Sequence, residues 1–345
     1  MTRTHASLAL VLSVTAVSVA LIAPAAVAGS AIQTPVRNNP DVWEDFPASG
    51  TDGLNQFFAW TKNSQAKPNA FNAFLQNTSL KGIGPIRVNP SNTRGYTGGI
   101  EGDRLLWQQV KRGQSDLRLY DYSQERNVAV PPGLNDNDWQ WRPSFDGETY
   151  LYGQNRFNTP DAPWKVILAT EQDGSIVDKI VLDSAKNRCK CIWPGQVVGD
   201  YATWTKCTTT CQVWIYEISS DTSTRVSNET ARNQYHGVPD VNGAVYLARG
   251  GNGCGENVNL VSYAYGSGGR DLVTELPDGK DVTDLTVVPG SPSTIFFGRV
   301  GCTQQAQGDI FSIQEIAPTR VAAPAARTGS RVDRVRPPLP NGAKP

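Results

Sequence analysis

Histidine is almost missing from this 345-residue sequence, which contains two of them. His5 lies in an apolar N-terminal stretch that we interpret below as a leader, so the remaining chain has His236 alone. Zinc and iron sites built from several histidines are therefore excluded, and any catalytic triad with a histidine has to use His236. His236 could be a catalytic base or, as is more common for one histidine at a strand start, a hydrogen-bonded structural residue.

Net charge is also missing, because 32 Lys and Arg balance 32 Asp and Glu. The balance conceals an asymmetry between two parts of the chain. Residues 29–316 hold 25 basic and 31 acidic residues, whereas residues 317–345 hold six basic residues and one acid. A body of net charge −6 is poor in the clustered cations that neutralise phosphates, so we expect no nucleic-acid partner.

Long apolar runs are limited to one, from Ala6 to Val27. It follows the basic residue Arg3 and closes on Ala26-Val27-Ala28, which is the pattern of a secretory signal peptide over residues 1–28. An uncleaved membrane anchor is the alternative, which Pro24 within the run disfavours. No second stretch approaches the roughly 20 apolar residues of a membrane span. We therefore expect a mature chain without a transmembrane segment, secreted or held in the cell envelope.

Cysteine is scarce but even in number. Beyond the leader the cysteines are Cys189, Cys191, Cys207, Cys211, Cys254 and Cys302. An even count in an exported chain favours disulfides. The two close pairs also suggest a four-cysteine zinc site, but neither has the C-x₂-C spacing usual for zinc. We expect the bonds Cys207–Cys211 and Cys254–Cys302, with Cys189 and Cys191 paired to each other, and no metal or cofactor.

The C-terminal residues 317–345 are rich in Pro, Ala and Arg and show no periodicity. Such a composition buries too little apolar surface to offset the entropy of an ordered chain. We expect a disordered tail, which is either a solvated extension or a segment that binds acidic partners or the envelope.

Between these ends the sequence repeats itself. One recurring apolar run contains a bulky residue that is followed two places later by a cation or an amide. The bulky residues are Trp60, Trp107, Tyr152, Trp204, Leu247 and Phe297, at separations of 47, 45, 52, 43 and 50. A second run follows each of them after a polar gap. Its reference residues are Phe71, Leu117, Trp164, Val213, Val258 and Ile310, at separations of 46, 47, 49, 45 and 52.

Both runs alternate in polarity and are rich in aromatic and β-branched residues, which predicts half-buried strands. A glycine turn such as Phe145-Asp146-Gly147 precedes the first run, and a short fourth strand follows the second. A repeated four-stranded unit of 40–50 residues indicates a β-propeller blade. Residues 41–316 supply 46 residues for each of six blades. We therefore predict an all-β fold, a six-bladed β-propeller of four-stranded antiparallel blades over 41–316, preceded by an N-terminal segment at 29–40. The segment near Val42-Trp43 is a candidate for the strand that closes the sixth blade.

The turn that leads into an apolar strand, Pro143-Ser-Phe-Asp-Gly-Glu-Thr-Tyr-Leu-Tyr152, resembles the repeat of TolB-like six-bladed propellers. The fuller family turn has two more residues between Pro and Asp-Gly, so this sequence departs from it there. The resemblance covers most of 41–316. It implies the propeller fold and a secreted or periplasmic setting, in a group whose members mostly act as binding or scaffolding modules.

Blade topology places the loops after the second strand and before the first strand on one face. All six cysteines fall in such loops, over blades 4 to 6. The cations expected at this face are Lys62, Lys111 or Arg112, Arg156, Lys206, Arg249 and Arg299. The residues expected there at the starts of first strands are Asp138, Trp139, Trp141, Arg142, Trp193, Tyr235, His236, Asp281 and Asp284. Aromatic rings stack on apolar sugar faces and arginine grips carboxylates, so this set suits an anionic or sugar-like ligand. The other interpretation is that the charges are solvated and the rings fill gaps between blades.

Three functions remain. The first is a non-catalytic binding or scaffolding module, monomeric, that holds a protein, a carbohydrate or a small anionic ligand at this face. The second is a propeller glycosidase with two of the carboxylates of Asp45, Asp138 and Asp284 placed about 5–10 Å apart around the scissile bond. The third is a structural envelope protein attached through its basic tail. An appended serine hydrolase of the prolyl-peptidase type is excluded because no Gly-x-Ser-x-Gly elbow is present.

Overall fold

The computed structural model describes the chain in fourteen pieces. They are residues 32–37, 39, 41–64, 67–156, 162–186, 191–226, 232–240, 243–250, 254–266, 270–277, 279–288, 293–302, 308–314 and 333–335. All regular elements in these residues are β-strands. The expected leader lies outside the described residues, as does the expected tail except for Asp333–Val335.

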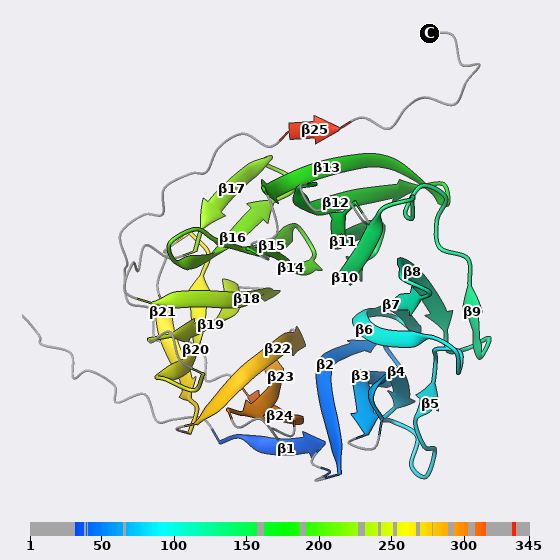
Figure 1. Cartoon of the computed structure of the whole chain (residues 1–345), viewed down its shortest axis with the longest axis horizontal. Coiled ribbons are helices and arrows are strands. Elements are labelled where there is room, and N and C mark those ends of the chain that lie inside the picture. Colours follow the sequence, from blue (N-terminus) through cyan, green and yellow to red (C-terminus); the bar gives the residue numbers. More distant parts are fainter. Residues whose placement is uncertain are drawn as a thin grey trace, which may run out of the picture.

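Six antiparallel sheets surround a common axis (Figure 1). Blade 1 contains β2 (Val42–Thr51), β3 (Gln56–Ser64), β4 (Lys67–Asn77) and β5 (Ile86–Arg87). Blade 2 contains β6 (Arg94–Glu101), β7 (Arg104–Lys111), β8 (Gln114–Asp121) and β9 (Arg126–Val128). Blade 3 contains β10 (Trp139–Asp146), β11 (Thr149–Asn155), β12 (Trp164–Gln172) and β13 (Ser175–Ala185). Blade 4 contains β14 (Ile192–Val198), β15 (Tyr201–Cys207), β16 (Cys211–Glu217) and β17 (Thr222–Arg225). Blade 5 contains β18 (Asn233–Asp240), β19 (Gly243–Arg249), β20 (Val258–Ala264) and β21 (Arg270–Glu275). Blade 6 contains β22 (Lys280–Val288), β23 (Thr294–Gly301), β24 (Gly308–Gln314) and β1 (Thr34–Arg37). A short strand, β25 (Asp333–Val335), pairs with the outer edge of β13. The predicted six-bladed propeller is confirmed.

The repeated apolar runs form the second and third strands of every blade. Their continuous apolar stretches are buried because neighbouring blades cover both faces of each sheet. Leu105, Leu106 and Trp107 of β7, for example, have no exposed surface. Leu105 and Trp107 pack with residues of blade 1 such as Phe57 in one core cluster, so the hydrophobic contacts run from blade to blade.

The ring closes through the N-terminus. β1 forms the outer strand of blade 6 and pairs with β24, with Thr34 opposite Ser312. The expectation that the segment near Val42-Trp43 closes the ring is wrong, because these residues begin β2, the innermost strand of blade 1. The side chain of Arg37 then links β1 to blade 1, where its guanidinium lies 4.1 Å from the centre of the Trp60 ring.

A β-bulge interrupts the innermost strand of every blade. The register shifts lie between Asp45 and Ala48, Thr97 and Ile100, Trp141 and Ser144, Pro194 and Val197, Tyr235 and Val238, and Val282 and Leu285. A bulge bends its strand and redirects a side chain. Because the six bulges occupy equivalent places, they form a ring of redirected residues around the axis.

The two faces of the propeller differ in charge. We call the face that carries the connections between second and third strands the loop face, and the opposite one the turn face. On the turn face, Gly102, Gly147 and Gly199 supply the positive φ angles, 57°, 57° and 54°, of two-residue hairpins. The described acids at or beside the turns there are Asp52, Glu101, Asp103, Asp121, Glu125, Asp146, Glu148, Glu171, Asp173, Asp200, Glu217, Asp221 and Asp240. The described cations there are Lys81, Arg104, Arg126 and Arg270. The turn face is therefore acidic.

Two of the expected disulfides are confirmed. Cys207 is bonded to Cys211 within blade 4, and Cys254 is bonded to Cys302 between the loops of blades 5 and 6. Both bonds lie on the loop face, as predicted. Cys189 lies outside the described residues, so its bond to Cys191 stays a prediction.

Candidate ligand-binding site at the axis

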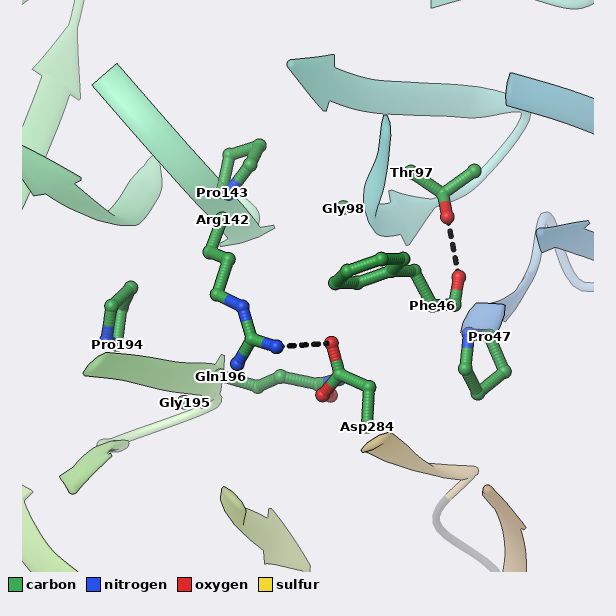
Figure 2. A pocket seen from close by; sticks show the side chains of 10 residues that line it. All are labelled: Phe46, Pro47, Thr97, Gly98, Arg142, Pro143, Pro194, Gly195, Gln196 and Asp284. Atoms are coloured by element: carbon green, nitrogen blue, oxygen red, sulfur yellow. Dashed lines mark hydrogen bonds and ion pairs between the residues drawn. The ribbon is translucent and has the colours of Figure 1, made fainter. Parts of the chain in front are cut away.

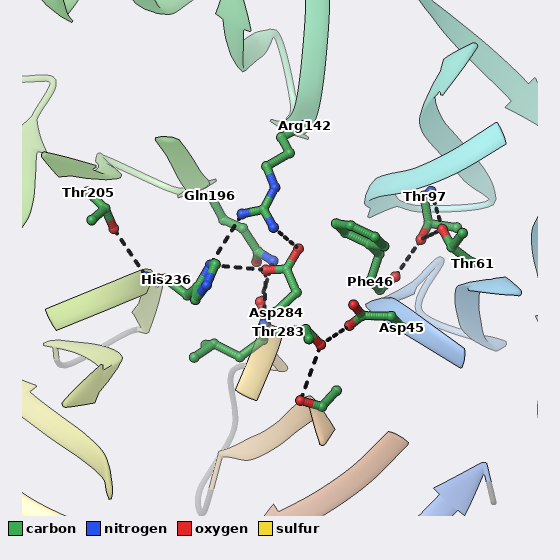
Figure 3. Close-up of polar contacts among 12 residues, drawn as sticks. Asp45, Phe46, Thr61, Thr97, Arg142, Gln196, Thr205, His236, Thr283 and Asp284 are labelled. Atoms are coloured by element: carbon green, nitrogen blue, oxygen red, sulfur yellow. Dashed lines mark hydrogen bonds and ion pairs between the residues drawn. The ribbon is translucent and has the colours of Figure 1, made fainter. Parts of the chain in front are cut away.

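Three side chains from three blades meet where the bulges surround the axis (Figure 3). Arg142 of blade 3 places Nη1 3.2 Å from Nδ1 of His236 in blade 5. Its Nη2 lies 3.7 Å from Oδ2 of Asp284 in blade 6, and Oδ1 of Asp284 lies 3.9 Å from His236 Nδ1. The guanidinium carbon of Arg142 also lies 5.3 Å from the centre of the Phe46 ring in blade 1. We call Arg142, His236 and Asp284 the axial cluster.

The backbone at this cluster is strained. Arg142 and His236 have φ angles of 47° and 52°, in the left-handed region that side chains other than glycine rarely adopt. Neighbouring blades hold these conformations in place. The amide of Arg142 donates to Oε1 of Gln108 in blade 2 at 3.3 Å, and the amide of His236 donates to the hydroxyl of Thr205 in blade 4 at 3.1 Å. Strain of this kind often accompanies functional sites, where it directs a side chain toward a ligand.

A small pocket opens beside the cluster (Figure 2). It has a volume of about 30 Å³ and is lined by Phe46, Thr97, Arg142, Gln196 and Asp284 among others. Such a volume holds a water molecule or one charged group but no whole sugar ring. The side chains of Arg142 and Asp284 are 22% and 23% exposed, so both are accessible from the pocket. The pocket therefore suits the end of a larger ligand.

Gln196 crosses from blade 4 to blade 6 beside this pocket. Its Nε2 donates to the Leu285 carbonyl at 3.1 Å, and its Oε1 accepts from the Thr286 hydroxyl at 3.1 Å. The amide side chain thus ties together two blades that are not neighbours in the ring, which fixes the wall of the pocket.

The two acids near the axis have different surroundings. Asp45 is 1% exposed, accepts a hydrogen bond from the Thr283 hydroxyl, and is so close to Gly298 that a Cβ there would collide with its carboxylate. Burial, followed by the nearby charge of Asp284, raises the pKa of Asp45 to about 7. Burial also raises the pKa of Asp284, although the charge of Arg142 opposes this shift. Asp45 is thus enclosed between blades 1 and 6, and Asp284 alone of the two faces the pocket.

His236 is held in its neutral form. Burial, followed by the charges of Arg142 and Arg249, lowers the pKa of the imidazole well below its ordinary value of 6.5. A neutral imidazole accepts a hydrogen bond on one ring nitrogen, which matches the donor that Arg142 presents. We therefore assign His236 as a positioning residue for Arg142.

Most of the cations expected on the loop face lie beside acids. Lys206 places Nζ 2.6 Å from Asp183, and Arg156 places Nε 3.8 Å from Asp138. Arg249 forms an ion pair with Asp281. Lys62 lies opposite Glu44 in the sheet, and Arg299 lies over the ring of Phe311 at 3.5 Å with Asp309 nearby. These residues do not converge on the axis; of the expected cations, Arg142 alone is placed there.

The expected tryptophans pack outside the axial cluster, whereas Tyr235 contacts the His236 ring at 6.2 Å between ring centres. Trp141 packs against Trp164 and against Gly153, where a Cβ would collide with the indole. Trp139 donates its indole N–H to the Gly113 carbonyl of blade 2 at 2.6 Å, and Trp193 contacts Tyr235 edge to face. Trp141 therefore fills space within blade 3, whereas the other contacts join neighbouring blades.

Sequence reasoning missed a second aromatic group. Trp43, Phe46, Phe71 and Tyr96 lie in blades 1 and 2, contact one another at ring-centre distances of 5.0–6.0 Å, and are all partly exposed. We call these four residues the aromatic wall. The repeat could have indicated this group, because its members occupy the same positions in their blades as the predicted tryptophans do. Trp43 is equivalent to Trp139, and Tyr96 is equivalent to Trp193.

Two other features are missing from the described part of the chain. No group of three or more His, Cys, Asp or Glu residues there is arranged to hold a metal ion. No helix in the same residues is long and apolar enough to cross a bilayer.

The molecule is thus a six-bladed β-propeller with a charged cluster at its axis, and known proteins match this fold but not the sequence. No protein-family model matches the chain, and no curated protein sequence does. Among solved structures, it is similar to a subtype N11 neuraminidase-like protein of A/flat-faced bat/Peru/033/2010 (H18N11), with a TM-score of 0.50 and 7% identity over 85% of this chain and 96% of that chain. TolB from Acinetobacter baumannii has a TM-score of 0.47 at 9% identity, over 78% of this chain and 79% of that chain. The β-propeller domain of the Trilobed protease from Pyrococcus furiosus has a TM-score of 0.48 at 10% identity, over 79% and 93%. At such low identity only the architecture is comparable.

Proposed function

We propose that the protein is a secreted, non-catalytic binding module that holds a ligand or a protein partner at the loop face, above the axial cluster. The observation that carries this proposal is the convergence of Arg142, His236 and Asp284 from three blades on one pocket. A site assembled from several blades around a strained backbone is costly to maintain, and a binding role accounts for it. A guanidinium has more donors than its contacts with His236 and Asp284 use, so Arg142 also suits a carboxylate or another anionic group of a ligand.

The positions of the carboxylates support binding over hydrolysis. A glycosidase needs two accessible carboxyl groups on either side of the bond that breaks. Asp45 is enclosed between blades, and Asp138 lies 3.8 Å from Arg156 at the start of blade 3. Asp284 therefore stands in the pocket without a second carboxylate from this group of three.

The disulfides support an exported protein. Cys207–Cys211 and Cys254–Cys302 both fix loops on the face where the partner is proposed to bind. Disulfides persist in oxidising compartments, which is consistent with secretion or with a place in the cell envelope.

The proposal is tested by screening soluble glycans, peptides and small organic acids against the wild type and the variant Arg142→Gln. We expect the variant to lose about tenfold or more of the affinity for whatever the wild type binds, because a charge-assisted contact is removed. Arg126→Gln, a cation on the turn face, should bind as the wild type does. Thermal unfolding of each variant separates loss of binding from loss of folding.

Two results would overturn the proposal. Turnover of a polysaccharide that Asp284→Asn abolishes would make the protein an enzyme. Binding that survives Arg142→Gln but disappears when residues 317–345 are deleted would place the function in the tail.

A further inference from the structure

We infer that the loop face over blades 1 and 2 is a docking surface for an acidic polysaccharide, whose rings stack on the aromatic wall and whose carboxylates pair with Lys67, Lys111 and Arg112. The inference rests on the proposed binding function and names the class of ligand. It also moves the main contact area away from the disulfide-bonded loops of blades 4 to 6.

The aromatic wall provides the apolar part of this surface. Trp43 and Phe46 belong to β2, Phe71 to β4 and Tyr96 to β6, so two adjacent blades contribute. Trp43 and Tyr96 lie near the starts of first strands and Phe71 near the start of a third strand, which are positions on the loop face. Partly exposed rings with one wet side are the usual platforms for flat apolar ligand faces.

Three cations without an ion pair among the described residues lie on the loop face of the same two blades. Lys67 follows the loop between β3 and β4, and Lys111 and Arg112 lie at the tip of the hairpin between β7 and β8; all three are exposed. None of the three forms an ion pair with any residue that the structure describes. These three cations contrast with Lys206 and Arg249, which are paired with Asp183 and Asp281.

The wall leads to the axial cluster. Phe46 is both a member of the wall and a lining residue of the axial pocket, and it lies under the guanidinium of Arg142. A chain that lies along the wall therefore ends at Arg142, whose pocket takes one charged group. The small volume of that pocket is explained if it receives a carboxylate while the rings stay on the surface.

The overall charge favours a polysaccharide over other polyanions. A body of net charge −6 with an acidic turn face repels the dense charge of nucleic acid, about one phosphate for each 1.7 Å of duplex. A uronate chain carries about one carboxylate for each ring and offers an apolar ring face between charges, which matches a wall flanked by cations. An acidic peptide carries the charge without the flat rings.

The test measures binding of alginate, a polyuronate, by titration calorimetry at low and at high salt. Dextran serves as the uncharged sugar chain and poly-L-glutamate as the acid without rings. We expect alginate to bind in preference to both. The triple variant Lys67→Gln/Lys111→Gln/Arg112→Asn should lose about tenfold in affinity and most of the salt dependence, because exposed charge pairs contribute modestly and are screened by salt. Asparagine is chosen at Arg112 because the φ angle there is 49°.

Phe71→Leu and Tyr96→Leu test the stacking part with little change in volume. Each should weaken alginate binding roughly threefold to tenfold while leaving the salt dependence intact. Lys81→Gln, on the turn face of blade 1, is the matched control and should change nothing. The thermal unfolding midpoint of every variant checks that the propeller remains folded.

The outcomes separate this inference from the proposed function. Equal binding of poly-L-glutamate, or equal binding of dextran, overturns the acidic polysaccharide. Failure of alginate to bind, while another ligand binds in a manner that depends on Arg142, overturns the inference and leaves the binding function standing. Alginate binding that the triple variant retains in full places the contact elsewhere and overturns the assignment to blades 1 and 2.

Discussion

Arg142 and His236 meet across the axis through Nη1 and Nδ1, 3.2 Å apart, although they come from blades 3 and 5. A guanidinium can only donate hydrogen bonds, so Nδ1 of His236 carries no proton and the neutral ring carries it on Nε2. Both residues have left-handed backbones at equivalent bulges. The pair therefore joins two blades that are not neighbours and fixes the direction in which Arg142 points.

The titration of His236 should report this contact. We expect its pKa to lie below 6.5 in the wild type and to rise in Arg142→Gln, without reaching 6.5 because burial is the largest cause of the shift. Imidazole NMR resolves the residue, since His5 is the one other histidine. Because the pKa of His236 is lower in the folded than in the unfolded state, the free energy of unfolding of the protein decreases as the pH falls below 6.5. Identical pKa values in both proteins would show that Arg142 exerts no charge effect on the ring.

Asp45 should make stability depend on pH in the opposite direction. Its folded pKa of about 7 exceeds the unfolded value near 4, so the folded chain holds the proton more tightly and stability falls as the pH rises from about 4 to 7. Asp45→Asn keeps the shape and removes the titration. We expect the variant to match the wild type below about pH 4, to be slightly more stable at pH 5, and to melt a few degrees higher at pH 8. A difference in melting temperature that does not change with pH would contradict this assignment.

The two disulfides should differ in their contribution to stability. Cys254–Cys302 closes 48 residues and joins two blades, whereas Cys207–Cys211 closes four within one hairpin. From loop length alone, the losses are about 4 and about 2 kcal/mol. Denaturant midpoints of the two double-serine variants measure the order, and each serves as the control for the other. A larger loss from removal of Cys207–Cys211 would show that loop closure does not set the effect.

Arg37 should stabilise the contact between β1, the strand that closes blade 6, and blade 1. Its guanidinium lies 4.1 Å from the Trp60 ring and donates to Gln76, so one residue of β1 contacts two strands of blade 1. Arg37→Met keeps the length and removes the cation, and we expect a loss of about 1–2 kcal/mol with a change in Trp fluorescence. Arg126→Met, on the surface of blade 2, should change neither the stability nor the fluorescence. An unchanged unfolding curve for Arg37→Met would show that the backbone pairing of β1 with β24, and not this side chain, stabilises the closure of the ring.

The fold was predictable from the sequence because the same packing recurs in every blade and requires bulky apolar residues at the same positions of each repeat. The second and third strands of each blade are buried on both faces, so residues such as Trp107 and Trp204 recur with the blade period. The closing strand was not predictable, because Thr34–Arg37 is short and partly exposed and its partner, β24, stands more than 270 residues later. Local sequence carries no record of such a distant pairing.

The candidate site was predictable only in part. Arg142, His236 and Asp284 were each expected on the loop face, yet nothing in the chain indicated that the three meet. Their convergence depends on bulges, which arise from strand register. The pairing of Lys206 and Arg249 with acids was also hidden, since Asp183 and Asp281 come from other blades.

The completion of blade 6 by β1 has a consequence for how the chain reaches its native state. The first strand to be made, β1, finds its partner β24 only after the last blade has been made, so the ring cannot close earlier. Blades 1 to 5 can form in order from local hairpins, whereas closure has to bridge almost the full length of the chain, which makes it a slow, late step. The intermediate that precedes closure is therefore an open ring whose β24 edge stays unpaired until β1 binds to it.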